Sequence, residues 1–247
     1  MPRILTASDR SALIRLASTM PSGSPERKAI LAGLSKTASG EANIPGVHVF
    51  GNAKVSDNAR VYGKAEVFGD AQVSGNARVY EKAQVHDNAK VFGKALVSGW
   101  AVVYGRAVVS GSADVSGKAK VTGDAYVSGN AYAYGSAQVF GDARVYGVAK
   151  VFGDAQVSGK AEVFGDARVY GDAKVYGGSR VSGSAQVLGK ALVSGRAEVF
   201  GYAYVSGDAQ VRGKARIGGT AVIVGGEWDG SEGEILSGRW LAPGVPA

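Results

Sequence analysis

Cysteine is absent from the 247-residue chain, and histidine occurs only at His48 and His86. Without cysteine there is no disulfide framework, no thiolate metal ligand and no thiol nucleophile. Two histidines cannot form a three-histidine metal site within one chain. No apolar run approaches the roughly 18 residues of a membrane span, and the N-terminus lacks the apolar core of a signal peptide. We therefore expect no cofactor, no membrane association, and a location in the cytoplasm or in a virion.

Insertions are also absent from residues 51–224, so no loop is available there to build a substrate pocket. The many Gly-x-Ala spacings belong to a repeat and are not a phosphate-binding loop. Ice binding through threonine arrays is excluded, because only Thr122 and Thr220 occur in this region. Acidic residues interrupt the rows of Lys and Arg, which argues against a nucleic-acid interface. The sequence thus predicts no catalytic residue, no metal ligand and no nucleic-acid partner.

What the chain does contain is one repeat of the form Gly-Asx/Lys-Ala-x-Val-x. Residues 51–224 hold 29 such hexads. Position 3 is Ala in 28 of them and position 5 is Val in 26. Position 1 is Gly in 26, and the exceptions are Asp57, Glu81 and Asp87. Regularity of this kind specifies a solenoid, which grows along one axis by stacking similar units.

Within a hexad the Ala and Val are separated by a single residue, so in an extended segment both point to one face. Position 4 between them is mostly Lys, Arg, Glu or Gln and points outward. Glycine at position 1 supplies the positive φ or tight backbone that a corner needs. Each hexad is therefore one short strand and one corner, and the strands stack in parallel. Aromatic residues at position 6, such as Phe152 and Tyr170, are expected to stack from one coil to the next.

Charges on stacked strands favour three hexads per coil over two. At every third hexad, position 4 alternates in sign from Arg144 through Glu162, Arg180 and Glu198 to Arg216. Like charges directly opposite each other are destabilising, so this alternation supports a coil of three hexads. The preference is modest, because Lys150, Glu162 and Lys174 alternate at every second hexad.

These hexads resemble the hexapeptide-repeat proteins that form left-handed parallel β-helices, and the resemblance covers the whole array from residue 51 to 224. It is closest to the very regular Gly-Asx-Ala-x-Val-x arrays of bacterial and phage proteins. One feature differs: the familiar acyltransferase hexad places Gly directly after the inward aliphatic residue, and here it follows one residue later. The resemblance implies an all-β solenoid, a triangular left-handed β-helix of about ten 18-residue coils.

Two segments flank the repeat. Residues 1–40 predict a short helical hairpin, with helices starting near Ser8 and Ser24. This hairpin either caps the solenoid or acts as an adaptor that binds another protein. The solenoid itself spans 41–224, with 45–50 as a degenerate first strand. Residues 225–247 are Gly-rich and acidic, and form a C-terminal cap, or a tail that makes a trimer or binds a partner.

The net charge of +7 is unevenly distributed: residues 51–224 carry +7, residues 1–50 carry +3 and residues 225–247 carry −3. A basic body with an acidic tail favours anionic partners or head-to-tail self-association. A solvated surface with an excess of Lys and Arg is the simpler interpretation.

A few large apolar side chains occupy positions that are otherwise polar, and such patches usually mark a contact. Leu96, Trp100, Val102 and Val108 occupy such positions, and together with Tyr104 they are expected to form a belt over one or two coils. With Trp228 and Trp240 of the C-terminal tail, the candidate interaction patch consists of Leu96, Trp100, Val102, Tyr104, Val108, Trp228 and Trp240.

We therefore predict a non-enzymatic structural or adaptor protein that self-associates, for example as a trimer, or docks on another structural protein. Its setting would be a phage particle or a bacterial assembly. One alternative is a hexapeptide acyltransferase-like enzyme, in which the resemblance implies His86 as a general base at a subunit interface. The other is a carbohydrate-binding surface built on the Tyr and Phe corners.

Overall fold

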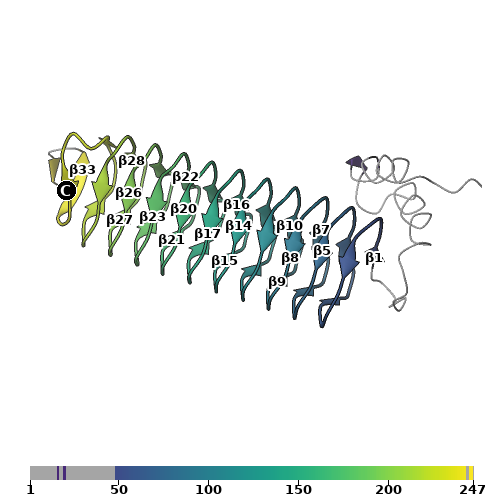
Figure 1. Ribbon diagram of the computed structural model, residues 1–247. Coiled ribbons are helices and arrows are strands. Elements are labelled where there is room, and N and C mark those ends of the chain that lie inside the picture. The colour runs from purple at the N-terminus through teal and green to yellow at the C-terminus, as the bar shows by residue number, and fades with distance from the viewer. Residues whose placement is uncertain (1–15, 17–18, 21–47, 243–244, 247) are drawn as a thin grey trace, which may run out of the picture.

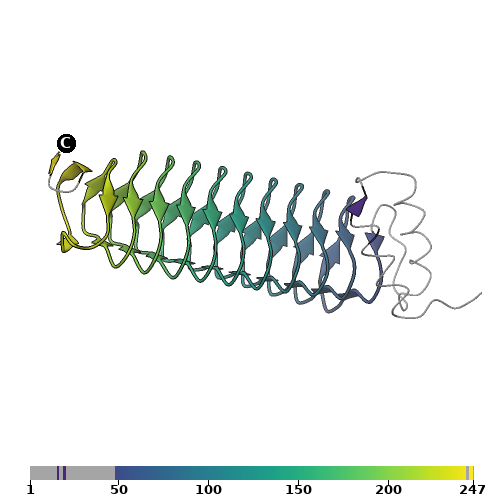
Figure 2. The same cartoon turned by 90° about the horizontal axis from the view of Figure 1, so that it is seen from above.

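The computed structural model describes residues 16, 19–20, 48–242 and 245–246, and over 48–242 the chain is a parallel β-solenoid whose coils stack along one axis (Figure 1). Seen from above, strands of the same sheet follow one another along the whole rod (Figure 2). The predicted helical hairpin of residues 1–40 lies outside the described residues, apart from Leu16, Thr19 and Met20.

Successive strands go to three sheets in strict rotation, so every third strand pairs. Sheet A contains β1 (His48–Val49), β4 (Glu66–Val67), β7 (Gln84–Val85), β10 (Val102–Val103), β13 (Lys120–Val121), β16 (Gln138–Val139), β19 (Gln156–Val157), β22 (Lys174–Val175), β25 (Leu192–Val193), β28 (Gln210–Val211) and β31 (Glu227–Trp228). Sheet B contains β2 (Lys54–Val55), β5 (Gln72–Val73), β8 (Lys90–Val91), β11 (Val108–Val109), β14 (Tyr126–Val127), β17 (Arg144–Val145), β20 (Glu162–Val163), β23 (Arg180–Val181), β26 (Glu198–Val199), β29 (Arg216–Ile217) and β32 (Glu234–Ile235). Sheet C contains β3 (Arg60–Val61), β6 (Arg78–Val79), β9 (Leu96–Val97), β12 (Asp114–Val115), β15 (Tyr132–Ala133), β18 (Lys150–Val151), β21 (Arg168–Val169), β24 (Gln186–Val187), β27 (Tyr204–Val205), β30 (Val222–Ile223), β33 (Arg239–Ala242) and β34 (Val245–Pro246).

The register confirms the predicted coil of three hexads. Arg144 pairs with Glu162, and Glu162 pairs with Arg180, in parallel strands. Backbone N–H groups of each coil donate to carbonyls of the next, as from Arg144 N to Ala161 O at 2.9 Å. The corners are bonded in the same way, as from Asp142 N to Gly159 O at 2.8 Å. We name the three corners AB, BC and CA after the sheets that they join.

Alanine at position 3 and valine at position 5 fill the interior of the prism. Ala143 and Val145, for example, have no exposed surface. Ser179 replaces one interior alanine and is also fully buried, but its hydroxyl donates to the carbonyl of Tyr176 at 2.9 Å. The hydrogen bond offsets the cost of burying a polar group, so one serine fits a core that is otherwise aliphatic.

Position 1 of the hexads lies at the corners, with φ near +70° at most of its glycines. A Cβ at Gly111 would also lie 2.8 Å from the carbonyl oxygen of Gly129 in the next coil. Three acidic residues nevertheless take this position, at φ of 59° to 61°. Each accepts a hydrogen bond from the corner N–H one coil on: Asp57 from Gly75, Glu81 from Gly99 and Asp87 from Gly105. These bonds account for the exceptions to glycine.

The solenoid has eleven coils, one more than the hexads alone predict. At its start, the degenerate segment forms β1, which pairs with β4. At its end, residues after Val224 continue as β31, β32 and β33, which pair with β28, β29 and β30. The inward side chains there are Trp228, Ile235 and Trp240 in place of valine. β34 then pairs antiparallel with β33, the one antiparallel pair among the described strands.

Candidate interaction surfaces

The apolar residues predicted to form a belt lie on one coil, but on different faces of the prism. Leu96 belongs to sheet C, Val102 to sheet A and Val108 to sheet B. Trp100 lies at the CA corner between Leu96 and Val102, and Tyr104 lies at the AB corner between Val102 and Val108. The belt therefore bends around two corners and is not one flat contact face.

Trp100 is the exposed member of this belt, with 54% of its surface accessible. The Nζ atom of Lys82, one coil earlier, lies 3.9 Å from the centroid of the indole ring. A cation over the face of a tryptophan is attracted by the ring quadrupole. The other four members of the belt are half-buried. The side chain that most readily meets a partner is therefore Trp100.

Trp228 and Trp240 do not lie in this belt, because they close the C-terminal end of the core. Trp228 is 1% exposed, and Trp240 packs partly buried against the core. The two rings meet edge to face with centroids 6.3 Å apart. Their indole N–H groups donate to the carbonyls of Gly225 and Ser237. Trp228 thus has no surface to offer a partner, and its role is to end the solenoid.

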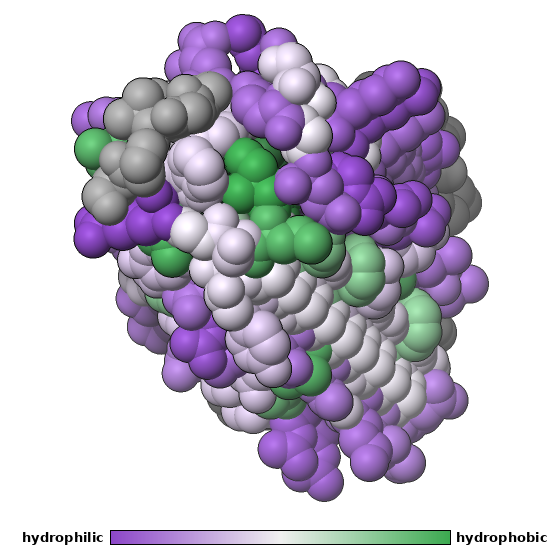
Figure 3. All heavy atoms as spheres, turned by 90° about the vertical axis from the view of Figure 1, so that its left-hand side faces the viewer, coloured by the Kyte–Doolittle hydropathy of each residue, from purple (hydrophilic) through white to green (hydrophobic). Residues whose placement is uncertain are grey.

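The C-terminal end also exposes some apolar surface. Looking onto this end, Figure 3 shows green apolar side chains gathered among purple hydrophilic ones. Leu236 and Leu241 of the last coil are each 48% exposed. Hydrogen bonds from Ser231 nearby lower the pKa of the Asp229 carboxyl. The end of the rod therefore combines a small apolar area with a turn that favours an ionised carboxylate.

Sheet B carries a continuous ladder of ion pairs, which we call the ladder. Arg and Glu alternate on six consecutive strands, and each neighbouring pair is within ion-pair distance. The five contacts are Arg144–Glu162 at 3.9 Å, Arg180–Glu162 at 3.7 Å, Arg180–Glu198 at 3.7 Å, Arg216–Glu198 at 3.0 Å and Arg216–Glu234 at 3.0 Å. The ladder confirms the alternation predicted from the sequence, and Glu234 extends it into the last coil.

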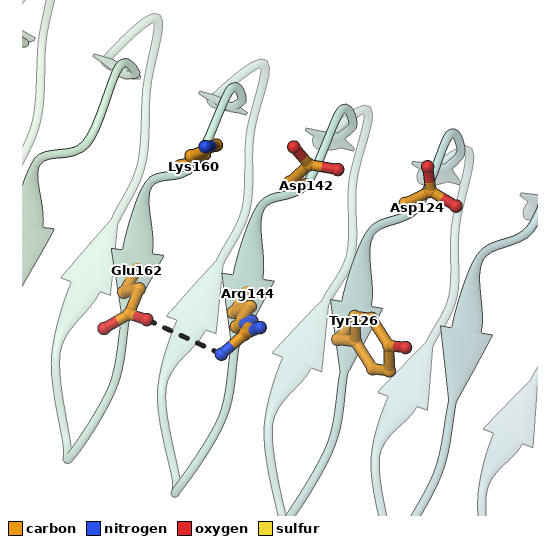
Figure 4. Close-up of a pocket in the computed structure, with 6 residues that line it drawn as sticks. All are labelled: Asp124, Tyr126, Asp142, Arg144, Lys160 and Glu162. Carbon is orange, nitrogen blue, oxygen red and sulfur yellow. Dashed lines mark ion pairs between the residues drawn. The ribbon is translucent and has the colours of Figure 1, made fainter.

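A shallow hollow of about 380 Å³ lies beside the ladder. Figure 4 shows Asp124, Asp142 and Lys160 in a row at the AB corner, above Tyr126, Arg144 and Glu162 on the strands. Most of these charges already have partners: Asp124 pairs with Arg106 at 2.6 Å and Arg144 pairs with Glu162. The hollow is an open surface feature, and Asp124, Arg144 and Glu162 in its lining form ion pairs between successive coils.

His86 lies at the AB corner within a stack of aromatic rings. Its ring centroid is 4.6 Å from that of Phe68 and 5.0 Å from that of Tyr104, with the ring planes 9° and 16° apart. Its side chain is 13% exposed, and Nδ1 is 3.3 Å from a carboxylate oxygen of Asp87. Other corners stack in the same way, as in Tyr134–Phe152–Tyr170. The predicted aromatic stacking is confirmed, and His86 is one of its members.

One charged surface is not among those predicted from the sequence. The first four CA corners, between β3 and β4, β6 and β7, β9 and β10, and β12 and β13, concentrate cations together with Trp100. We call this surface the basic edge. Its six cations, all exposed, are Arg60, Lys64, Arg78, Lys82, Lys118 and Lys120. The signal for it is present in the sequence, because Lys64, Lys82, Trp100 and Lys118 share one position in every third hexad.

Within the described part of the chain, no group of three or more His, Cys, Asp or Glu side chains is placed to hold a metal ion. No helix among the described residues is long and apolar enough to span a membrane.

Comparison with known families finds one similarity. Residues 71–87 and 167–183 match the family model described as YdcK beta solenoid repeat. Each segment contains three consecutive strands, β5–β7 and β21–β23, and therefore one complete coil with a strand on each sheet. The chain is similar to that repeat, which supports a β-helix of this general kind. No curated protein and no solved structure gives a match.

Proposed function

We propose that this chain is a non-enzymatic structural or adaptor protein. It acts as a stiff rod that docks on a partner or on further copies of itself, for example as a trimer, within an assembly such as a virion or a bacterial particle. Its place of action is accordingly the cytoplasm or the virion. The observation that carries the proposal is the unbroken register from β1 to β30, in which strand follows strand without an inserted loop.

An unbroken register supports this role for a physical reason. Each coil is hydrogen-bonded to the next at both strands and corners, so the rod is stiff along its whole length. Specific recognition then has to use side chains on the outer faces and corners. The exposed Trp100 and the basic edge are surfaces of that kind.

Light scattering coupled to gel filtration, together with small-angle X-ray scattering, tests the role. We expect an elongated particle with a mass above the 25.2 kDa of one chain, or a stable complex with a partner. Trp100→Asp is the variant expected to lower the mass or the binding. Tyr202→Asp, at the 73% exposed Tyr202 of a BC corner, is the matched control. A strictly monomeric protein that retains no partner contradicts the proposal, as does acyl transfer from acetyl-CoA that disappears in His86→Ala.

A further inference from the structure

We propose that the basic edge binds a linear acidic polysaccharide. The carboxylates or sulfates of the glycan pair with the six cations, and one sugar ring lies on Trp100. This inference rests on the proposed docking function and names the chemistry of the partner.

The cations of the basic edge have no ion-paired acidic partner among the described residues. None of the six forms an ion pair with another described residue. Two nearby acids are already engaged: Glu81 accepts the N–H of Gly99 at 2.7 Å, and Glu66 accepts the side-chain amide of Gln84 at 3.0 Å. A third, Asp114 on β12, is half-buried. Ion pairs within the described part of the chain therefore leave the positive charge of the edge unneutralised.

Like charges stack on one another at the basic edge. Arg60 pairs directly with Arg78 in sheet C, and Lys64 lies one coil before Lys82 at the corner. Like charges directly opposite each other destabilise a sheet. The later CA corners do not gather cations at this hexad position, which holds Asp154, Asp172, Lys190 and Asp208. One pair of cations does occur beside them, because Lys150 pairs with Arg168 in sheet C. The clustered cations of the basic edge therefore repel one another, and an anionic ligand would relieve this repulsion.

The spacing of the cations along the basic edge suits a linear glycan. Cations at equivalent positions are separated by one coil, about 4.8 Å along the axis. This rise is close to the length that one pyranose ring adds to an extended glycan. A straight polymer with one acidic group per sugar, laid along the corner, therefore meets a new cation at nearly every sugar.

One coil of the basic edge carries no cation. That coil presents Leu96 and Val102 on either side of the 54% exposed Trp100. An exposed indole suits the apolar C–H face of a sugar ring. Amide and hydroxyl groups for sugar hydroxyls lie alongside, at Gln84 and Ser116.

The same features make a nucleic acid a poorer fit. Base recognition in single strands uses open aromatic faces inside a charged groove. Here the edge is a convex corner. Tyr62 and Tyr80 stack on each other with centroids 5.1 Å apart and planes 4° apart, and Lys82 covers one face of Trp100. The edge supplies charge and one half-exposed indole ring, which matches a hydroxyl-bearing polyanion better than a chain of bases.

The test is equilibrium binding of the full chain by isothermal titration calorimetry. The probes are polygalacturonate and dextran sulfate, with uncharged dextran as the neutral control and a thymidine oligonucleotide as the competing polymer. We expect at least one acidic glycan to bind, dextran not to bind, and affinity to fall with added salt. The double variant Lys64→Glu/Lys82→Glu should weaken binding by about tenfold or more, because two attractive pairs become repulsive.

The matched control is Lys174→Glu/Lys190→Glu, which reverses two exposed lysines on sheet A and the CA corner several coils away. It should change the affinity less than about twofold, since those lysines lie beyond the Debye length from the edge. Trp100→Ala should weaken glycan binding several-fold and Tyr202→Ala should not. Circular dichroism checks that each variant is folded, and Lys118→Gln is a milder second test.

Three results would overturn the inference: no acidic glycan binds, both double variants lose affinity equally, or the oligonucleotide binds more tightly than either glycan. If no glycan binds while the particle still self-associates or holds a protein partner, the polysaccharide is wrong and the docking function stands. If the chain is a monomer that binds none of the probes or partners, both proposals fail.

Discussion

The ladder and the basic edge use the same backbone for opposite patterns of charge. On sheet B, Arg and Glu alternate from Arg144 to Glu234, and every neighbour is an ion pair. On the first four CA corners, cations gather and none has a described ion-pair partner. The regular hexads would allow either pattern at either place. We infer that charge on sheet B stabilises the rod, whereas charge on the basic edge is kept for a ligand at some expense of stability.

The largest expected effect is the difference between substitutions at the two ends of the rod. Trp228→Ala removes the buried side chain that ends the core, and should lower the free energy of unfolding by about 3–5 kcal/mol. Glycan binding should be unchanged, because the basic edge lies at the other end. Trp100→Ala should do the reverse, with a loss of stability below about 1 kcal/mol and weaker binding. Urea unfolding and calorimetry measure both, and equal loss of stability in the two variants would contradict this division.

The next effect breaks the ladder. Glu162→Lys replaces two ion pairs with three stacked cations, Arg144, Lys and Arg180, and should lower the free energy of unfolding by about 1–2 kcal/mol. Asp166→Lys makes the same charge reversal at an exposed corner residue without a described ion pair, and should cost less than about 0.5 kcal/mol. Chemical unfolding at low salt compares them. Equal losses of unfolding free energy in the two variants would mean that the ion pairs of the ladder do not stabilise the fold.

A smaller effect of opposite sign is expected at the basic edge. Arg78→Glu gives Arg60 an acidic neighbour in place of a like charge, and should raise the free energy of unfolding by about 0.5 kcal/mol. The same change should weaken binding of an acidic glycan. A variant that is both less stable and unimpaired in binding would show that the repulsion at this edge is unimportant.

The smallest effect concerns pH. The pKa of Asp229 is lowered from its ordinary value of 3.8, mainly by hydrogen bonds from the backbone and hydroxyl of Ser231. A carboxyl with a depressed folded-state pKa contributes stability above its unfolded pKa, and that stability is lost as pH falls toward the folded value. The last coil should therefore loosen below about pH 4, and Asp229→Asn should remove this dependence. Hydrogen exchange of residues 225–242 in both proteins measures it, and identical pH profiles would contradict the assignment.

Much of the fold follows from the sequence because each hexad encodes the same local structure. Alternating Ala and Val specify an inward face, and glycine specifies the corner. The sign alternation from Arg144 to Arg216 identifies the coil of three hexads correctly. The eleventh coil is harder to predict, because two of its three inward residues are tryptophans. In two of its pairings, Gln210–Glu227 and Val222–Arg239, the partners are also one residue closer in sequence than in a regular coil.

The candidate surfaces follow from the sequence only in part. The same position of consecutive hexads holds Leu96, Val102 and Val108. In a triangular coil, however, consecutive strands lie on different faces. Trp228 looks like a surface residue in a Gly-rich tail, and burial becomes visible only once its pairing with Val211 is known. The basic edge appears when charges are compared at every third hexad for each corner separately. When the charge is summed over all hexads, the acids of the other corners offset the lysines of the basic edge.

Residue-resolved footprinting of lysines is the most direct test of the contrast between the two surfaces. The chain is acetylated with a limiting reagent, with and without an acidic glycan that binds, and each lysine is quantified by mass spectrometry. We expect protection at Lys64, Lys82, Lys118 and Lys120, with Lys160, Lys174, Lys190 and Lys214 unchanged. Uniform protection, or protection concentrated at the second group, would contradict it.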